Sequence, residues 1–341
     1  MLKIEENVDI SNFTTLKLNA KARYFTRVKN AKELTEAYIF AENNNIQTLV
    51  IGGGSNIIFT NALVDKLLIK IEISSFCILS DNKYEFVVRI GAGENWDYVV
   101  ERTSMMGLSG IEAMSAIPGT VGGTPVQNVG AYGQEIKDTL ISLDAYDKEE
   151  KIIKSFTNEE CEFSYRDSIF KKPENKGRYV ITSVTLRLLK NKNEIPQYAD
   201  VIKYFADRNI PNPTPLEVRN AVIEIRSRKL PDPREIPSVG SFFKNPIISV
   251  DKANELKEKY SDMKIFPASA GFSKIPAGYL IESCGLKGKD IGKLSVYQNN
   301  ALVITNPNGA TYEDLLYTKN FIISEVEKKF GITLEPEPIF I

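Results

Sequence analysis

Residues 107–136 are the stretch that most limits how this chain can fold. They read GLSGIEAMSAIPGTVGGTPVQNVGAYGQEI, with seven glycines in thirty residues and few charged side chains. The stretch follows neither the 3.6-residue period of a helix nor the alternation of a strand. Glycine is costly to order, so a run of this kind is typical of backbone that must approach something closely. We therefore expect this segment to pack against another segment or a flat ligand.

A second glycine run, GGGSN at residues 52–56, follows IQTLVIG, which predicts a buried strand. Ile57 stands where the dinucleotide fingerprint G-x-G-x-x-G needs its last glycine, and no P-loop lysine follows. Backbone amides in a glycine turn can still cradle phosphate oxygens. Taken alone, the run is explained more simply as a tight turn that ends a strand.

Two separated glycine-rich segments fit an extended dinucleotide, and Gln127, Asn128 and Tyr132 supply polar groups beside the second one. The alternative is a loop that packs only on itself. The residues alone leave both interpretations open.

Composition removes several classes of function. The chain has 341 residues, which predicts two or three domains, and it contains no histidine, which argues against a catalytic zinc site. A net charge of −1 gives no electrostatic footprint for nucleic acid or for an anionic membrane. Three distant cysteines predict neither a disulfide framework nor a metal site, and they favour a reducing cytoplasm. The start lacks signal-peptide features, and no apolar run is long enough to span a membrane.

Periodicity and capping residues predict several helices among strands. The expected helices cover residues 30–45, 95–107, 214–230, 276–285 and 311–330. Thr214 followed by Pro215 and Glu217 gives the clearest helix start. In the helix at 95–107 we expect Trp96, Val99, Val100 and Met106 to face inward. The alternation of strands and helices predicts an α+β or α/β chain with several subdomains.

Ser241, in VGSFFKNP, raises a chemical question because no histidine is available to act as its base. A serine hydroxyl can act as a general acid only toward a strongly basic centre such as a carbanion or enolate. Arg166, in FSYRDSIFK, can clamp a carboxylate and neutralise charge that develops beside it. The plainer alternatives are a small residue in a turn for Ser241 and a surface Arg–Asp pair for Arg166.

Glu335 and Glu337, in LEPEP, lie two residues apart and would face the same side of an extended strand. Pro336 and Pro338 restrict the segment to a sheet edge or to a position outside a ladder. A solvated acidic tail is the default interpretation.

Several segments together resemble one known family over nearly the whole chain. GGGSN, GIEAMSAIPGTVGGTPVQNVGAYGQEI, SYRDSIFK, VGSFFKNP, PAGYLIESCGLKG and LEPE occur in the order seen in the UDP-N-acetylenolpyruvoylglucosamine reductases. That family makes UDP-N-acetylmuramate for bacterial peptidoglycan in the cytoplasm, with FAD and NADPH. The segment from PQYADVIKYF to RKLPDP resembles the insertion of its longer, type I members.

The resemblance implies an α+β fold: a vanillyl-alcohol-oxidase (PCMH) type FAD-binding fold in two lobes and a smaller α/β substrate-binding C-terminal domain. The implied parts are 1–74 with the tail 331–341, then 75–229, then 230–330. The residues implied to bind FAD are Gly52, Gly53, Gly54, Ser55, Asn56, Ile117, Pro118, Gly119, Val121, Gly122, Gly123 and Gly130. Gly123 stands where some relatives have a serine, so Thr124 becomes an alternative contact to the flavin.

The resemblance also implies a mechanism. NADPH reduces the flavin, flavin N5 gives hydride to the enolpyruvyl methylene carbon, and Ser241 protonates the adjacent carbon. Arg166 and Glu337 correspond to the residues that stabilise the intermediate, with Glu335 as the rival of Glu337. The residues implied to contact the UDP-sugar or the nicotinamide cofactor are Tyr165, Tyr198, Arg226, Lys229, Asn245 and Asn300.

We expect the partner to be UDP-N-acetylglucosamine enolpyruvate, with no metal, no nucleic acid and no membrane, and we expect a monomer. One alternative is another flavin oxidase of the same fold; a chain without histidine cannot attach FAD covalently through that residue. The other is a sugar-nucleotide binding or transferase protein that uses the glycine loops for phosphate only.

Overall fold

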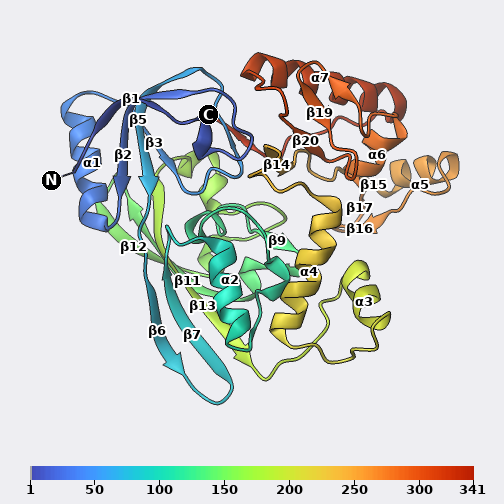
Figure 1. Ribbon diagram of the computed structural model, residues 1–341, viewed down its shortest axis with the longest axis horizontal. Helices are drawn as coiled ribbons and strands as arrows, with labels where there is room; N and C mark the ends of the chain where they lie inside the picture. The colour runs from blue at the N-terminus through green and yellow to red at the C-terminus, as the bar shows by residue number, and fades with distance from the viewer. Residues whose placement is uncertain (1) are drawn as a thin grey trace. The chain divides into compact units, whose positions relative to one another are not determined.

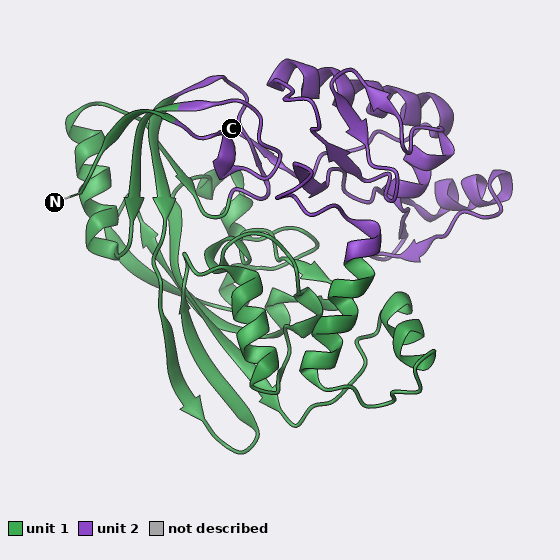
Figure 2. Ribbon diagram, in the orientation of Figure 1, with its two compact units in different colours: residues 1–8, 22–53, 65–226 green, residues 9–21, 54–64, 227–341 purple. Residues whose placement is uncertain are grey.

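The computed structural model describes residues 2–341, and contacts divide the chain into two compact units, coloured in Figure 2. Unit 1 comprises residues 2–8, 22–53 and 65–226, and unit 2 comprises residues 9–21, 54–64 and 227–341. We describe each unit by itself. The finer three-part division expected from the sequence stays a prediction.

Unit 1 is built on two sheets. One has the strand order β1-β2-β5-β3, in which β3 and β5 are parallel. The other has the order β12-β11-β13-β7-β6, with antiparallel neighbours, and its long strands lie side by side in Figure 1. β8 also pairs with β13, and β9 with β10. These strands are β1 (Glu5–Asp9), β2 (Lys21–Val28), β3 (Thr48–Ile51), β5 (Leu63–Ile71), β6 (Phe76–Asp81), β7 (Glu85–Gly91), β8 (Leu108–Ser109), β9 (Gly130–Ala131), β10 (Gln134–Glu135), β11 (Leu140–Asp147), β12 (Ile152–Thr157) and β13 (Tyr179–Lys190).

Within residues 2–341, unit 1 contains three helices that the sequence predicts and one, over residues 199–206, that it does not. They are α1 (Ala31–Asn43), α2 (Trp96–Met105), α3 (Ala199–Ala206) and α4 (Pro215–Lys229), the last of which runs into unit 2. Asn30 caps α1 by accepting from the amide of Glu33. Thr214 and Glu217 form the expected reciprocal pair at the start of α4. The helices expected at 30–45, 95–107 and 214–230 are therefore confirmed.

The core of unit 1 lies between its sheets and the inner faces of α1 and α2. Trp96 is fully buried, and its indole nitrogen donates to the carbonyl of Met114 at 3.1 Å. Val99 and Val100 are buried as expected, but the expectation for Met106 is wrong, since it is 47 % exposed. Met106 follows the last helical residue, and Gly107 after it turns the chain with φ 72°.

Unit 2 holds the C-terminal part of the chain and two segments from near the N-terminus. Its sheets have the orders β14-β20-β19-β18 and β15-β17-β16, and β21 pairs in parallel with β4. Its helices, α5 (Val250–Lys259), α6 (Ala277–Ser283) and α7 (Tyr312–Phe330), enclose the core of this unit, and α6 and α7 confirm the predicted helices. Its strands are β4 (Ile57–Ile58), β14 (Ser238–Ser241), β15 (Ile247–Ser249), β16 (Phe266–Pro267), β17 (Phe272–Lys274), β18 (Asp290–Ile291), β19 (Leu294–Val296), β20 (Val303–Thr305) and β21 (Ile339–Phe340).

One buried side chain fixes an N-terminal segment to the rest of unit 2. The Asn306 amide donates to the carbonyl of Leu16 at 3.0 Å, and its oxygen accepts from the amide of Ala310 at 2.7 Å. Because a buried amide must be fully hydrogen-bonded, this residue fixes one arrangement of the two segments.

Candidate active site

The two glycine-rich segments singled out in the sequence lie against each other in unit 1. A Cβ on Gly53 would lie 2.6 Å from the Cα of Gly119, and one on Gly52 would lie 2.4 Å from the hydroxyl oxygen of Thr120. No larger residue fits at these positions without moving the opposite segment. The prediction of a backbone packed closely against another segment is confirmed.

The second segment is fixed from outside by main-chain hydrogen bonds. The amide of Trp96 donates to the carbonyl of Gly119, and the amide of Gly122 donates to the carbonyl of Ala92. Gly123 is exposed, with open space where a Cβ would stand. The Thr124 hydroxyl, by contrast, is buried and donates to the carbonyl of Val121 at 2.7 Å. Gly123 therefore leaves room for a flat ligand, while Thr124 is engaged within its own turn.

Thr120 provides a test of whether the place where the two glycine-rich segments meet fits a dinucleotide. Its hydroxyl oxygen is buried and has no hydrogen-bond partner within residues 2–341. The amides of Gly53 and Gly119 likewise donate to no other group in that part of the chain. Unpaired donors beside glycines are what a bound pyrophosphate would satisfy, so the residues present fit FAD.

The rest of GGGSN belongs to unit 2. Gly54 has φ 64°, and a Cβ there would lie 1.7 Å from the carbonyl oxygen of Phe13. The carbonyl of Asn56 accepts from the amide of Ile339 at 2.9 Å, and its side chain donates to the carbonyl of Glu337 at 3.4 Å. The glycine turn is therefore joined to the C-terminal tail. Ser55, the residue between Gly54 and Asn56, is half-buried.

Arg166 lies in unit 1 with a left-handed backbone, φ 56°. Its guanidinium donates to the carbonyls of Gly130 at 2.8 Å and Asn128 at 3.4 Å, and it also lies 5.4 Å from the centre of the Tyr165 ring. The side chain is half-buried and is held by main-chain acceptors.

Polar side chains in unit 1 stabilise the loop segments around Arg166. The Asn128 amide donates to Glu135 at 2.9 Å and to the carbonyl of Ser164 at 3.0 Å. Burial raises the pKa of the Glu135 carboxyl, but Lys137, Asn128 and Arg166 lower it by more, so the group stays ionised. A carboxylate near Arg166 therefore balances its charge from within unit 1.

Tyr198 and Arg226 lie close to one polar side chain of the glycine-rich stretch. The rings of Tyr198 and Tyr132 meet edge to face with their centres 5.0 Å apart. Arg226 donates to the carbonyl of Ala116 at 3.2 Å. Tyr132 is one of the groups that favour the charged form of Arg226. Burial lowers the pKa of Arg226, as it does for any cation taken from water. Tyr198 itself is 44 % exposed, directly before α3.

Ser241 and Glu337 lie on adjacent stretches of unit 2. Ser241 ends β14 and is half-buried, after Gly240 with φ 75°. The next residue, Phe242, accepts from the amide of Glu337 at 2.9 Å, and Phe243 bridges to Pro336. The amide of Lys244 also donates to the carbonyl of Glu335 at 2.9 Å, so both glutamates of the tail lie on the stretch that pairs with residues 242–244.

Glu335 has a different environment from Glu337. Its carboxylate pairs with Lys244 at 2.5 Å, and its side chain is 71 % exposed. Glu337 is half-buried, beside the strand that carries Ser241. The assignment of the catalytic role to Glu337 rather than to Glu335 stays a prediction.

The remaining predicted substrate residues in unit 2 have local contacts. The side-chain oxygen of Asn245 accepts from the amide of Ala277, the first residue of α6, at 2.9 Å. That of Asn300 accepts from the amide of Leu302 at 3.0 Å, in the turn before β20. Lys229 is exposed at the end of α4. The predicted site residues thus fall into one set in each unit.

Comparison with known families identifies the chain. Residues 232–341 match the family model "UDP-N-acetylenolpyruvoylglucosamine reductase, C-terminal domain", and residues 22–155 match "FAD binding domain". A UDP-N-acetylenolpyruvoylglucosamine reductase of Flavobacterium johnsoniae is 42 % identical over 98 % of this chain and 99 % of its own length. One from Bdellovibrio bacteriovorus is 38 % identical over 99 % of both chains. The chain belongs to the UDP-N-acetylenolpyruvoylglucosamine reductase family.

Solved structures agree with the fold of this reductase family. The crystal structure of the Thermus caldophilus enzyme (MurB) has a TM-score of 0.68 and 21 % identity, covering 100 % of this chain and 99 % of that one. The predicted α+β fold, with an FAD-binding part and a C-terminal domain, is confirmed, as is an FAD-dependent oxidoreductase. The FAD-binding match includes both glycine-rich segments.

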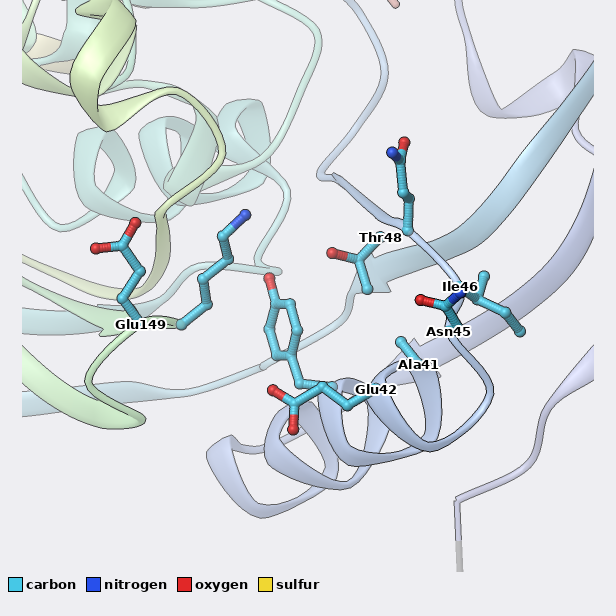
Figure 3. A pocket seen from close by; sticks show the side chains of 9 residues that line it. Ala41, Glu42, Asn45, Ile46, Thr48 and Glu149 are labelled. Atoms are coloured by element: carbon cyan, nitrogen blue, oxygen red, sulfur yellow. The ribbon is translucent and has the colours of Figure 1, made fainter.

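A cavity elsewhere in unit 1 of this reductase is separate from the predicted site. It has a volume of about 660 Å³, and Figure 3 shows residues of α1, β3 and the turn after β11 around it. Glu42 on its wall pairs with Lys151, and Glu149 pairs with Arg178. None of the predicted site residues lines this cavity.

Sequence reasoning missed Thr120, Asp97 and Arg219. Thr120 stands in the glycine-rich segment, but only its burial sets it apart from a surface threonine. Asp97 and Arg219 pair across 122 positions of sequence, a contact that no local pattern reveals. Within residues 2–341 no group of three or more acidic or cysteine side chains could hold a metal ion, and no helix is long and apolar enough to cross a membrane.

Proposed function

We propose that this reductase converts UDP-N-acetylglucosamine enolpyruvate into UDP-N-acetylmuramate, with NADPH as the electron donor. When bound, FAD supplies a carrier that accepts hydride from NADPH and passes it to the substrate. The product gains one hydride at the methylene carbon and one proton at the adjacent carbon. The chain must therefore supply the proton, bind the carboxylate and exclude water.

Ser241 is the proton donor in this proposal. The weakly acidic hydroxyl can give up its proton because the carbon beside the carboxylate becomes strongly basic once hydride has added to its neighbour. Arg166 binds the substrate carboxylate, and Glu337 stabilises the charge that develops there. The observation that carries the proposal is the pairing of Phe242 with Glu337, which holds the serine and the glutamate on adjacent stretches of unit 2.

The substrate residues follow the same proposal. Tyr165, Tyr198, Arg226, Lys229, Asn245 and Asn300 would contact the UDP-sugar or the nicotinamide cofactor. The FAD contacts would come from 52–56, 117–123 and Gly130. Tyr198, whose exposed ring meets Tyr132 edge to face, would cover the UDP group in this proposal. A cytoplasmic location fits the cysteine usage.

Flavin colour tests the proposal. The purified protein should be yellow, should bleach when NADPH is added under anaerobic conditions, and should regain its colour when UDP-N-acetylglucosamine enolpyruvate follows. Bleaching without recovery would indicate a different oxidant and contradict the substrate. A colourless protein that still binds the UDP-sugar would contradict the flavin mechanism itself.

A further inference from the structure

Ala116 adopts an unfavourable backbone conformation directly before the segment assigned to FAD. Its φ is 57°, in the left-handed region that residues with a Cβ rarely occupy. The next seven residues, 117–123, are those expected to line the cofactor. Because a turn at this point sets the direction in which the segment leaves, whatever holds Ala116 also sets the path of that segment.

Two charged side chains hold Ala116 from opposite ends of the residue. Its amide donates to the Asp97 carboxylate at 2.6 Å, and its carbonyl accepts from Arg226 at 3.2 Å. The other end of the short segment is tied to the same helix, because the Trp96 amide donates to the carbonyl of Gly119 at 3.1 Å. Adjacent residues at the start of α2 therefore fix both ends of 116–119.

Asp97 is itself held by a buried partner. Arg219 of α4 donates to both carboxylate oxygens, at 2.5 and 3.1 Å, and its side chain is only 6 % exposed. Arg219 also lies 3.7 Å from Glu101, one turn along α2. A two-point pair fixes the plane of the carboxylate, which aims one oxygen at the amide of Ala116.

Asp97 is not needed to cap its helix. Asn95 is the capping residue of α2 and accepts from the amide of Tyr98 at 2.9 Å. Burial raises the pKa of the Asp97 carboxyl, but Arg219, the Ala116 amide and Arg226 lower it by more. The group is therefore an anion directed at the turn.

We propose that Asp97, held by Arg219, is a positioning residue that keeps Ala116 in its left-handed conformation and so sets the path of the FAD-binding segment 117–123. This inference rests on the proposed contact between that segment and FAD. Asp97 needs no contact with FAD, because it acts through the backbone of Ala116.

The test measures how fast the purified holoprotein releases FAD. On dilution, free FAD becomes fluorescent, and the rise gives the release rate. Asp97→Asn should release FAD about ten to a hundred times faster, because the acceptor of the Ala116 amide loses its charge and can no longer pair with Arg219 through two oxygens. Arg219→Lys should show a smaller increase, since lysine cannot hold both oxygens. Arg23→Met, which breaks an exposed pair with Asp65 in the same unit, should change nothing.

Glycine at position 116 separates positioning from a general structural role. Glycine takes a left-handed φ without penalty. Adding Ala116→Gly to Asp97→Asn should therefore remove at least half of the increase in the logarithm of the FAD release rate. The single Ala116→Gly variant completes the double-mutant cycle. If Asp97→Asn fails to fold, the same cycle on Arg219→Lys gives the answer.

Two results would overturn the inference. One is an Asp97→Asn protein that releases FAD at the wild-type rate. The other is fast release that Ala116→Gly does not slow, which would make Asp97 a brace between α2 and α4 only. Failure of the proposed function looks different, because the wild-type protein would then lack the colour cycle while these release rates could still be measured.

Discussion

At the scale of single residues, Ser241 shows what a chain without histidine requires of its other side chains. Its hydroxyl has no imidazole to activate it, and in the proposed reaction it acts as an acid toward a carbanion. The sequence showed that Ser241 has no histidine base, but it could not predict the backbone hydrogen bond between Glu337 and Phe242. That pairing joins residues about a hundred positions apart, which no local pattern reports.

Asp147 gives a residue-scale prediction for pH. Two nitrogens of Arg178 and the ammonium of Lys154 surround its fully buried carboxylate. Hydrogen bonds from Arg178 lower the pKa of this carboxyl well below its ordinary value of 3.8. Burial raises the pKa, but by less than these hydrogen bonds lower it. A lowered folded-state pKa means that the stabilisation is complete above about pH 4 and is lost as the pH falls toward that lower value.

The Asp147→Asn variant should therefore be less stable at pH 7 by about 2 kcal/mol, because Arg178 and Lys154 lose their buried anion and keep only the exposed Glu149 and Glu150. The deficit should shrink below pH 4, where the wild-type protein loses the same contribution. Urea unfolding at pH 7, 5, 4 and 3 measures this. Asp65→Asn, at an exposed pair, is the control and should have little effect. A deficit that stays constant with pH would show that the charge of Asp147 does not matter.

At the scale of elements, helix starts and buried faces were readable because they depend on residues three or four positions apart. Thr214 stands where α4 begins, and Val99 and Val100 are buried as the period of α2 predicts. Met106 was misplaced because periodicity continues through a helix end that Gly107 imposes. The glycine-rich segment had no period, so the sequence predicted only that it packs closely against something, and did not predict that Gly53 is what it approaches.

Capping of α4 gives a prediction at this scale. Thr214→Ala removes the acceptor for the amide of Glu217, which should lower the free energy of unfolding by about 1 kcal/mol. Thr35→Ala serves as the control, because the Thr35 hydroxyl only donates back to a carbonyl within α1. Thermal unfolding of the two variants compares them directly. Equal effects would contradict a specific role for the cap.

The tail segment gives a matched pair of variants. Glu337→Gln should slow reoxidation of the reduced flavin by the UDP-sugar at least tenfold and should leave reduction by NADPH nearly unchanged. Glu335→Gln should leave both rates near wild type, since its exposed pair with Lys244 is weak. Stopped-flow absorbance of the flavin separates the two half-reactions. The reverse pattern would assign the role to Glu335.

At the scale of the whole molecule, motifs in sequence order were enough to predict the family, the cofactor and the fold, and these are confirmed. The sequence placed candidate residues from both units in one site. Arg166 belongs to unit 1, while Ser241 and Glu337 belong to unit 2. Their convergence on one carboxylate stays a prediction, because contacts between distant segments leave no periodic signature in the sequence.

The most direct measurement of that convergence follows the two half-reactions of Ser241→Ala separately in the flavin spectrum. NADPH should bleach the variant at close to the wild-type rate, because hydride transfer to the flavin needs no proton from the serine. Recovery of colour with UDP-N-acetylglucosamine enolpyruvate should be slower by about a hundredfold or more. Equal loss of both half-reactions, or a normal rate of recovery, would contradict the account.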